Sequence, residues 1–185
     1  MSLERIAIVG DSCSGKTTLS RDLSARLSLP HIELDRLFWG PSWTPRPFDE
    51  FSASIADAVT QTRWIMDGNY SRVMDRIWTR ATSLVWLDFP LALVLARGLR
   101  RSLRRSLRRE SLYSENRETM RRTFFSHDSL LLWIMTSRGP RRRRYQQVLE
   151  EGRFPQLEVH RLTSPGKAAQ WLEGLGTASN ECSLR

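Results

Sequence analysis

Eight consecutive residues near the N-terminus have the spacing of a phosphate-binding loop, Gly-x-x-x-x-Gly-Lys-Thr. The two glycines let the backbone curl so that successive N–H groups point at a phosphate. In such a loop the lysine reaches the β- and γ-phosphates of a nucleotide, and the threonine hydroxyl is a ligand for Mg²⁺. The sequence therefore predicts a site for ATP and Mg²⁺. The residues of this loop are Gly10, Asp11, Ser12, Cys13, Ser14, Gly15, Lys16 and Thr17.

Three aspartates, Asp35, Asp67 and Asp88, each end an apolar run that we expect to be a β-strand. Ligands of open parallel sheets bind at the carboxyl ends of the strands, so these carboxylates are candidates for the same site as the loop. Asp35 either accepts the proton of an acceptor hydroxyl or caps a turn. Asp67 and Asp88 either help to hold Mg²⁺ through water or cap the segments that follow them.

Arginines are candidates for stabilising a phosphoryl group in transfer, because its negative charge is spread over several oxygens. Arg97 and Arg101 lie one helical turn apart on an expected helix and therefore reach the same side. Arg117, Arg121 and Arg122 fall in a polar segment that we expect to act as a lid. The alternative for most arginines is a solvated basic surface.

The chain carries 29 Lys and Arg against 20 Asp and Glu, a formal net charge of +9. This excess indicates either binding of polyanions, nucleotides or nucleic acid, or a general use of arginine on the surface. Arginine also fills positions 141–144, a run that either touches nucleic acid or is solvated. Because this run is far in sequence from the other motif residues, we expect it to play no part in acceptor binding.

Aromatic residues cluster after the second expected strand and suggest a site for the acceptor of the phosphoryl group. Trp39, Trp43 and Tyr70 offer flat apolar surfaces for a base or ring. Arg72 offers a planar guanidinium that suits a phosphate or carboxylate. We therefore expect a small anionic acceptor between the Trp39/Trp43 segment and Arg72.

The elements that must position these residues alternate between strands and helices. Short apolar runs predict strands at 5–9, 31–35, 64–67, 84–88 and 157–162. Residues 16–27 repeat leucine every four positions, which predicts a helix, and further helices are expected at 51–59, 91–109, 124–135, 145–150 and 166–175. Such alternation predicts one three-layer α/β domain with a parallel sheet.

No apolar run reaches the length of about 20 residues that a membrane span needs. The N-terminus leads directly into the first expected strand, so we expect no signal peptide. The two cysteines, Cys13 and Cys182, have no partners at metal-ligand spacing. This pattern fits a cytoplasmic protein.

These motifs together resemble the adenylate kinase/shikimate kinase branch of the P-loop kinases, in particular the bacterial proteins described as DNA topology modulation or FlaR-like. One departure is notable: the Asp-Gly-Phe-Pro-Arg of nucleoside monophosphate kinases is replaced by Asp67-Gly68-Asn69-Tyr70-Ser71-Arg72. The other features of the resemblance are the phosphate loop, Glu33-Leu34-Asp35, Trp39, Trp43-x-Pro45, Leu87-Asp88-x-Pro90, Arg97, Arg101 and Thr163-Ser164-Pro165-Gly166.

The resemblance implies a five-stranded parallel sheet in the order 2-3-1-4-5 within one domain, 1–176, followed by a tail. It also implies an acceptor-binding region near 36–62 and a small helical lid near 105–125. Asp67 would be the second metal ligand beside Thr17. Thr18, Ser164 and Pro165 would join the loop in binding the nucleotide.

The function expected from residues and resemblance together is transfer of a phosphoryl group from ATP to a small anionic acceptor, most simply a nucleotide or nucleotide-like metabolite. Lys16, Asp35, Arg72, Arg97, Arg101, Arg117 and Arg121 are the expected catalytic residues. The alternatives are a small-molecule hydroxyl kinase of the shikimate or gluconate type, a nucleic-acid-associated ATPase and a nucleotide sensor. The protein would act as a monomer or homodimer.

Overall fold

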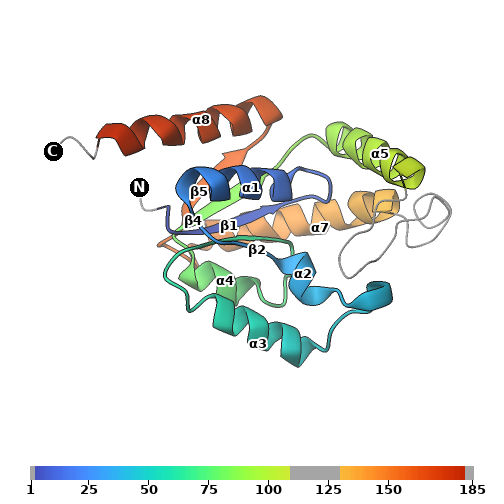
Figure 1. Cartoon of the computed structure of the whole chain (residues 1–185), viewed down its shortest axis with the longest axis horizontal. Coiled ribbons are helices and arrows are strands. Elements are labelled where there is room, and N and C mark those ends of the chain that lie inside the picture. Colours follow the sequence, from blue (N-terminus) through green and yellow to red (C-terminus); the bar gives the residue numbers. More distant parts are fainter. Residues whose placement is uncertain (1–2, 109–129, 182–185) are drawn as a thin grey trace.

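A five-stranded parallel sheet lies at the centre of the molecule, with its strands in the order β2-β3-β1-β4-β5 (Figure 1). The computed structural model describes residues 3–108 and 130–181. The order confirms the expected 2-3-1-4-5 sheet. The strands are β1 (Arg5–Gly10), β2 (His31–Glu33), β3 (Trp64–Asp67), β4 (Ser83–Leu87) and β5 (Glu158–Leu162).

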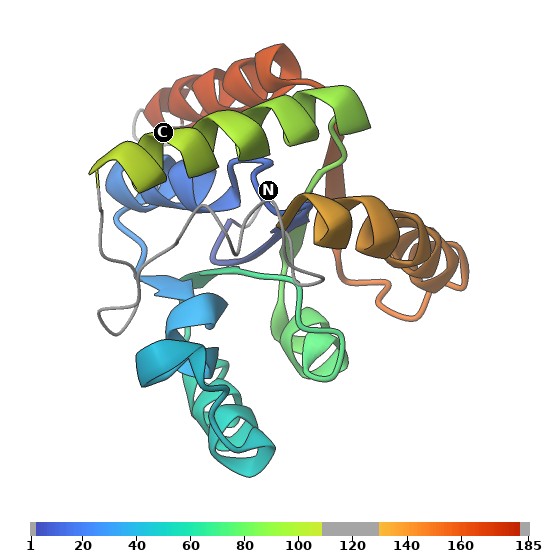
Figure 2. The ribbon, with the colours of Figure 1, turned by 90° about the vertical axis from the view of Figure 1, so that its right-hand side faces the viewer.

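Helices cover both faces of this sheet, which gives the expected three layers (Figure 2). One face packs against α1, α5 and α8, and the other against α3, α4 and the C-terminal half of α7. The helices are α1 (Lys16–Leu27), α2 (Leu34–Phe38), the 3₁₀ turn η1 (Pro41–Trp43), α3 (Phe48–Ala58), α4 (Met74–Arg80), α5 (Leu91–Arg108), α7 (Leu130–Glu150) and α8 (Pro165–Glu181).

The central strands carry side chains that are buried on both faces, as expected for a parallel sheet covered by helices. Every residue of β3 and β4 is buried. Alternate residues serve the two faces: Trp64 and Met66 pack toward α3 and α4, whereas Ile65 packs toward α1. The register sets Ile8 beside Asp67 and Gly10 beside Leu87, so the polar residues that follow these strands gather at one edge.

Three local expectations need correction. The second strand ends at Glu33, and Asp35 lies in the first turn of α2 instead of at a strand end. The two helices expected at 124–135 and 145–150 are, over the described residues, one helix, α7, which continues through Pro140. Helix α4 was not expected at all. The apolar contacts of α7 with both faces of the sheet outweigh the local helix-breaking effect of proline.

The expected lid at 105–125 falls mostly on residues 109–129, which lie outside the described part of the chain. Within the part that is described, no helix has the length and apolar character needed to cross a bilayer.

Gly68 follows the last residue of β3 and lies against Leu34 of α2, and we predict that Gly68→Ala destabilises the fold. Its φ is +154°, and a Cβ there would lie 2.7 Å from the Cβ of Leu34. Such overpacking costs roughly 1–3 kcal/mol. Gly152→Ala is the matched control, because its φ is also positive, +64°, but nothing lies within 4 Å. Urea unfolding of both variants would measure the difference, and equal losses would contradict the predicted steric contact.

Candidate functional site

The phosphate loop joins the C-terminal end of β1 to the N-terminus of α1, as the sequence predicts. Gly10 has a φ of +151°, and a Cβ at this position would lie 2.7 Å from the carbonyl oxygen of Leu87. Gly15, with a φ of +99°, is the residue immediately before α1. Gly10 is required both because a side chain would clash and because its φ is positive, whereas Gly15 is required because of its positive φ alone. The free N–H groups at the start of α1 face the loop.

Lys16 is folded back over this loop. Its Nζ donates hydrogen bonds to the carbonyl oxygens of Gly10 and Asp11, both at 3.1 Å. Burial lowers the pKa of Lys16, while the carboxylates of Asp35 and Asp67 oppose this shift. The ammonium is thus held by main-chain oxygens in the position from which it can exchange these weak acceptors for phosphate oxygens.

Thr17 and Asp67 lie together, as expected for residues that hold one metal ion. The Thr17 hydroxyl donates to Oδ2 of Asp67 at 2.9 Å, and Oδ1 of Asp67 lies 2.7 Å from Nε2 of His31. Asp67 is buried, and both of its oxygens are positioned by these contacts. A hydroxyl and a carboxylate are the oxygen donors that Mg²⁺ takes beside nucleotide phosphates, so the residues fit this ion. His31 was not expected here.

Asn69 and Tyr145 form a hydrogen-bonded chain that holds Gly10 at the start of the loop, and neither role was predicted. The side chain of Asn69 accepts a hydrogen bond from the Gly10 N–H at 3.2 Å and donates one to the Gly10 carbonyl. Tyr145 of α7 donates to Oδ1 of Asn69 at 3.4 Å. Burial raises the pKa of Tyr145 to about 12, so the phenol stays a neutral donor. The only signal in the sequence is the replacement of Phe-Pro by Asn69-Tyr70.

A large cleft of about 1720 Å³ runs from the phosphate loop to the aromatic segment after β2. Of the residues expected to bind the nucleotide, Ser12 through Thr18 and Pro165 line it. Gly10, Asp11 and Ser164 do not belong to its lining. Ser164 instead accepts a hydrogen bond from the N–H of Lys167 at 3.2 Å, which caps α8.

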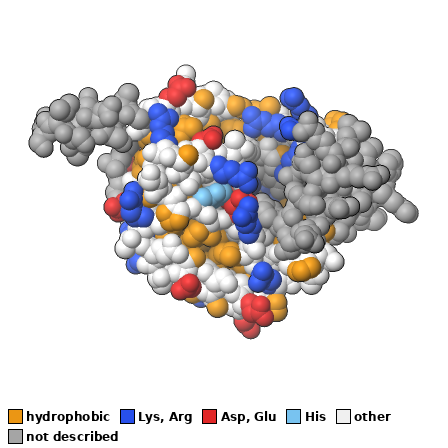
Figure 3. Space-filling view, in the orientation of Figure 1, with side chains coloured by type: hydrophobic (Ala, Val, Ile, Leu, Met, Phe, Trp, Pro, Cys, Tyr) orange, Lys and Arg blue, Asp and Glu red, His pale blue; other side chains and the backbone are white. Residues whose placement is uncertain are grey.

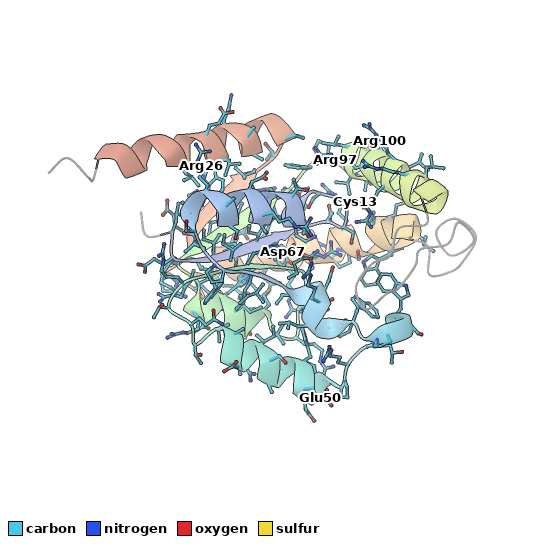
Figure 4. The ribbon with its side chains drawn as sticks, viewed as in Figure 1. Cys13, Arg26, Glu50, Asp67, Arg97 and Arg100 are labelled. Carbon is cyan, nitrogen blue, oxygen red and sulfur yellow. The ribbon has the colours of Figure 1, made fainter. Side chains whose placement is uncertain are left out.

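The arginines expected on α5 reach the loop. Arg97 donates to the carbonyl oxygen of Ser14 at 2.9 Å, and Figure 4 shows it between α5 and Cys13. Arg101 lines the cleft as well. Arg117 and Arg121 fall outside the described residues, so their catalytic role stays a prediction.

The acceptor end of the cleft contains the predicted aromatic residues. Trp39 and Trp43 line it with their rings 5.7 Å apart, edge to face. The Tyr70 hydroxyl donates to Oδ1 of Asp35 at 2.7 Å, and both residues line the cleft. Asp35 is exposed to the cavity, where a catalytic carboxylate would need to be.

Arg72 lies in the same part of the cleft, with its guanidinium carbon 3.5 Å from the centroid of the Phe48 ring. Stacking on this ring holds the planar group while leaving its N–H donors directed around its edge. Arg72 is therefore placed to bind an anionic group of an acceptor.

One residue of the arginine run at 141–144, Arg141, lies at the phosphate loop, a position that the sequence did not predict. Nη1 of Arg141 donates to Oδ1 of Asp11 at 2.8 Å, and Arg138 forms an ion pair with the other carboxylate oxygen. Arg141 also lines the cleft. The two segments meet although they are far apart in sequence, because α7 runs back along the sheet and passes the loop (Figure 1).

Asp88 belongs to a structural ion-pair cluster. Arg161 Nε donates to its Oδ2 at 2.9 Å and Arg142 Nε at 3.2 Å. Asp88 is buried and is not among the residues that line the cleft. Of the two alternatives for Asp88, these contacts favour a structural role over metal binding.

Solved structures of known proteins share this fold. A shikimate kinase from Acinetobacter baumannii in complex with shikimate has a TM-score of 0.55 at 16% identity, covering 100% of this chain and 97% of that chain. A shikimate kinase from Aquifex aeolicus vf5 has a TM-score of 0.54 at 14% identity, covering 97% and 98%. A gluconokinase from Sinorhizobium meliloti 1021 has a TM-score of 0.50 at 16% identity, covering 98% of each chain.

The fold is therefore the P-loop NTPase fold of the shikimate kinases, over the whole length of the chain. No protein-family model and no curated protein matches the sequence. The resemblance to the FlaR-like proteins accordingly stays a prediction.

Lys16 provides a direct test of the phosphate loop. We predict that Lys16→Ala lowers ATP turnover by roughly 10²–10³-fold, because one charged donor to the transferring group is lost. The folded state should persist, since Lys16 is the first residue of α1 and its ammonium donates to main-chain oxygens of the loop. Lys167→Ala, which removes the other lysine of the chain, is the matched control. Coupled detection of ADP with thermal melting would measure both effects, and an active Lys16→Ala protein would contradict the assignment.

Proposed function

We propose that this chain is a kinase that transfers the γ-phosphoryl group of ATP to a small anionic acceptor. The observation that carries this proposal is a cleft shared by the phosphate loop and by the aromatic segment with Arg72 and Asp35. A transfer reaction needs donor and acceptor in one enclosure so that the reacting atoms meet in a fixed orientation. The similar structures are named as kinases of small molecules, which supports this class of acceptor.

The nucleotide end of the cleft supplies the positive charge for the reaction. Lys16 would contact phosphate oxygens, and the N-terminus of α1 would add its free N–H groups. Thr17 and Asp67 would hold Mg²⁺, which neutralises charge on the β- and γ-phosphates when it is bound. Arg97, which donates to the Ser14 carbonyl, would lie beside the same phosphates.

Asp35 favours a hydroxyl group as the nucleophile over a phosphate. A carboxylate beside the reacting oxygen repels a phosphate, whereas it accepts the proton of a hydroxyl. As the acceptor oxygen forms its bond to the γ-phosphorus, the bond to the bridging oxygen breaks and ADP leaves with the electron pair. The hydroxyl proton passes to Asp35, which Tyr70 holds in place. We therefore place the hydroxyl-kinase alternative ahead of a nucleoside monophosphate acceptor.

A nucleic-acid-associated ATPase has less support. Arg141 and Arg142, half of the basic run, are bound to Asp11 and Asp88. On the face drawn in Figure 3, Lys and Arg side chains lie in separate groups interrupted by acidic and apolar ones. A continuous basic track is the usual footprint of nucleic-acid binding.

Arg72 tests the anionic acceptor. In a screen of hydroxy acids, sugar acids, nucleosides and nucleoside monophosphates with coupled ADP detection, we expect turnover with an anionic acceptor. Arg72→Ala should then raise the acceptor KM by roughly 10- to 100-fold, as expected for one lost charge-assisted contact, with the KM for ATP unchanged. Arg76→Ala is the matched control, because Arg76 contacts Ser52 and does not line the cleft. A silent Arg72→Ala change would contradict the proposed anion site.

Asp35 tests the nucleophile. If the acceptor reacts through a hydroxyl, Asp35→Asn should lower kcat by roughly 10²–10⁴-fold, because the proton acceptor is lost while the shape is kept. Tyr70→Phe should cost far less, since it removes only one hydrogen bond to Asp35. Steady-state kinetics with the acceptor from the screen would measure both. A faster reaction of Asp35→Asn with a nucleoside monophosphate would instead support a phosphate nucleophile.

A further inference from the structure

One face of α7 points a set of polar side chains at the phosphate loop. Arg138, Arg141, Arg142 and Tyr145 follow the i, i+3, i+4, i+7 spacing of a helix face. All four have partners at the carboxyl edge of the sheet. Arg138 and Arg141 bind Asp11, Arg142 binds Asp88 and Tyr145 donates to Asn69.

The reason for the first two contacts lies in the charge of Asp11. This carboxylate belongs to a loop that must attract phosphates, yet it is buried, with a side-chain exposure of 8%. A buried carboxylate without a counter-charge is strongly unfavourable. Arg138 and Arg141, themselves only 15% and 14% exposed, supply this counter-charge, and Arg138 also pairs with Asp88 at 3.5 Å.

Arg141 differs from the other arginines of α7 because it also lines the cleft. Its charge adds to burial in lowering the pKa of Lys16, which places the two cations close together. Its hydrogen bonds within the described residues, from Nη1 to Asp11 and from Nη2 to Ser137 at 2.6 Å, use two of the five N–H donors of a guanidinium. The same group can therefore bind Asp11 and an anion in the cleft at once.

The position of Arg141 in the cleft indicates which phosphate of a bound nucleotide it would contact. Pro165 and Arg97 mark the side of the loop toward α5 and α8. Arg141 lies on the opposite side, one turn of α7 before Tyr145, which contacts Asn69 after β3. This is the side of β3, where the aromatic segment also lines the cleft, so a terminal phosphate directed toward an acceptor would lie nearest to Arg141.

We propose that Arg141 is a catalytic arginine that contacts the γ-phosphoryl group of the nucleotide, and that Asp11 holds its guanidinium over the loop. The inference rests on the ATP-binding part of the proposed function. It assigns to α7 the stabilisation of the transferring phosphoryl group, which the sequence analysis expects of the lid arginines. Asp11 acts as a positioning residue for Arg141, and Arg138 is the second cation paired with Asp11.

Nucleotide binding tests this without knowledge of the acceptor. Isothermal titration of the full chain would compare Mg²⁺ with AMPPNP, which has a terminal phosphoryl group, against Mg²⁺ with ADP, which lacks it. Arg141→Ala should weaken AMPPNP by roughly 10- to 100-fold and ADP by no more than about threefold. Arg142→Ala is the matched control and should leave both affinities near wild type, because Asp88 keeps Arg161.

A second pair of variants separates contact with phosphate from mere neutralisation of Asp11. If Arg141 only balances Asp11, the double variant Asp11→Asn with Arg141→Ala recovers wild-type affinity for both nucleotides. If Arg141 touches the γ-phosphoryl group, the double variant keeps the loss that is specific to AMPPNP. Should Arg141→Ala fail to fold, Arg141→Lys keeps the charge, and it should still lose part of the selectivity because the planar fork is gone.

The outcomes distinguish the two proposals. A wild-type chain that binds neither nucleotide overturns the proposed function and this role with it. A wild-type chain that binds both, with equal losses for AMPPNP and ADP in Arg141→Ala, or with no loss at all, overturns only the role of Arg141. Loss of the same selectivity in Arg142→Ala would also overturn it.

Discussion

Buried negative charge at the carboxyl edge of the sheet is the constraint on which much of the structure depends. Four carboxylates of the described chain are buried, those of Asp11, Glu33, Asp67 and Asp88. A buried carboxylate must be paired or hydrogen-bonded, because removing it from water costs several kcal/mol. Each one has such partners, and those of Asp11, Asp67 and Asp88 come from elements that are distant in sequence. Neutralising this edge therefore fixes where α7 and β5 must lie as well as stabilising the loop.

The sequence was a good guide wherever the determinants are local. The phosphate loop follows from glycine spacing, and the sheet follows from short apolar runs that alternate with helical periods. It was a poor guide to partners across the fold: nothing local links Arg141 to Asp11, 130 residues away in sequence. Pro140 concealed the continuity of α7, and the placing of Asp35 depended on a strand that ends two residues early. These features are determined by tertiary packing, which overrides the local secondary-structure propensity of the residues.

The two ends of the cleft have opposite electrostatic tasks, which explains their different composition. The loop end must stabilise phosphates and therefore concentrates cations and helix N–H groups. In the proposed reaction the acceptor end would bind an anion and activate a nucleophile, tasks that suit Arg72 and Asp35 in turn. Aromatic rings lie around both: Phe48 stacks on Arg72, and Tyr70 bonds Asp35. Aromatic side chains have few rotamers, so they hold Arg72 and Asp35 in place at little cost in conformational entropy. The two opposite charges can therefore lie in one cavity without forming an ion pair with each other.

In the proposed role of Arg141, stability and catalysis are coupled through the same side chains. Arg138 and Arg141 both pair with Asp11, which fixes their guanidinium groups beside the loop. Preorganised charges need no rearrangement during the reaction, which is the main source of electrostatic stabilisation of a transition state. An isolated arginine in the same place would be either solvated or mobile. Asp11 thus converts a requirement of folding, the pairing of a buried charge, into the positioning of a cation beside Lys16.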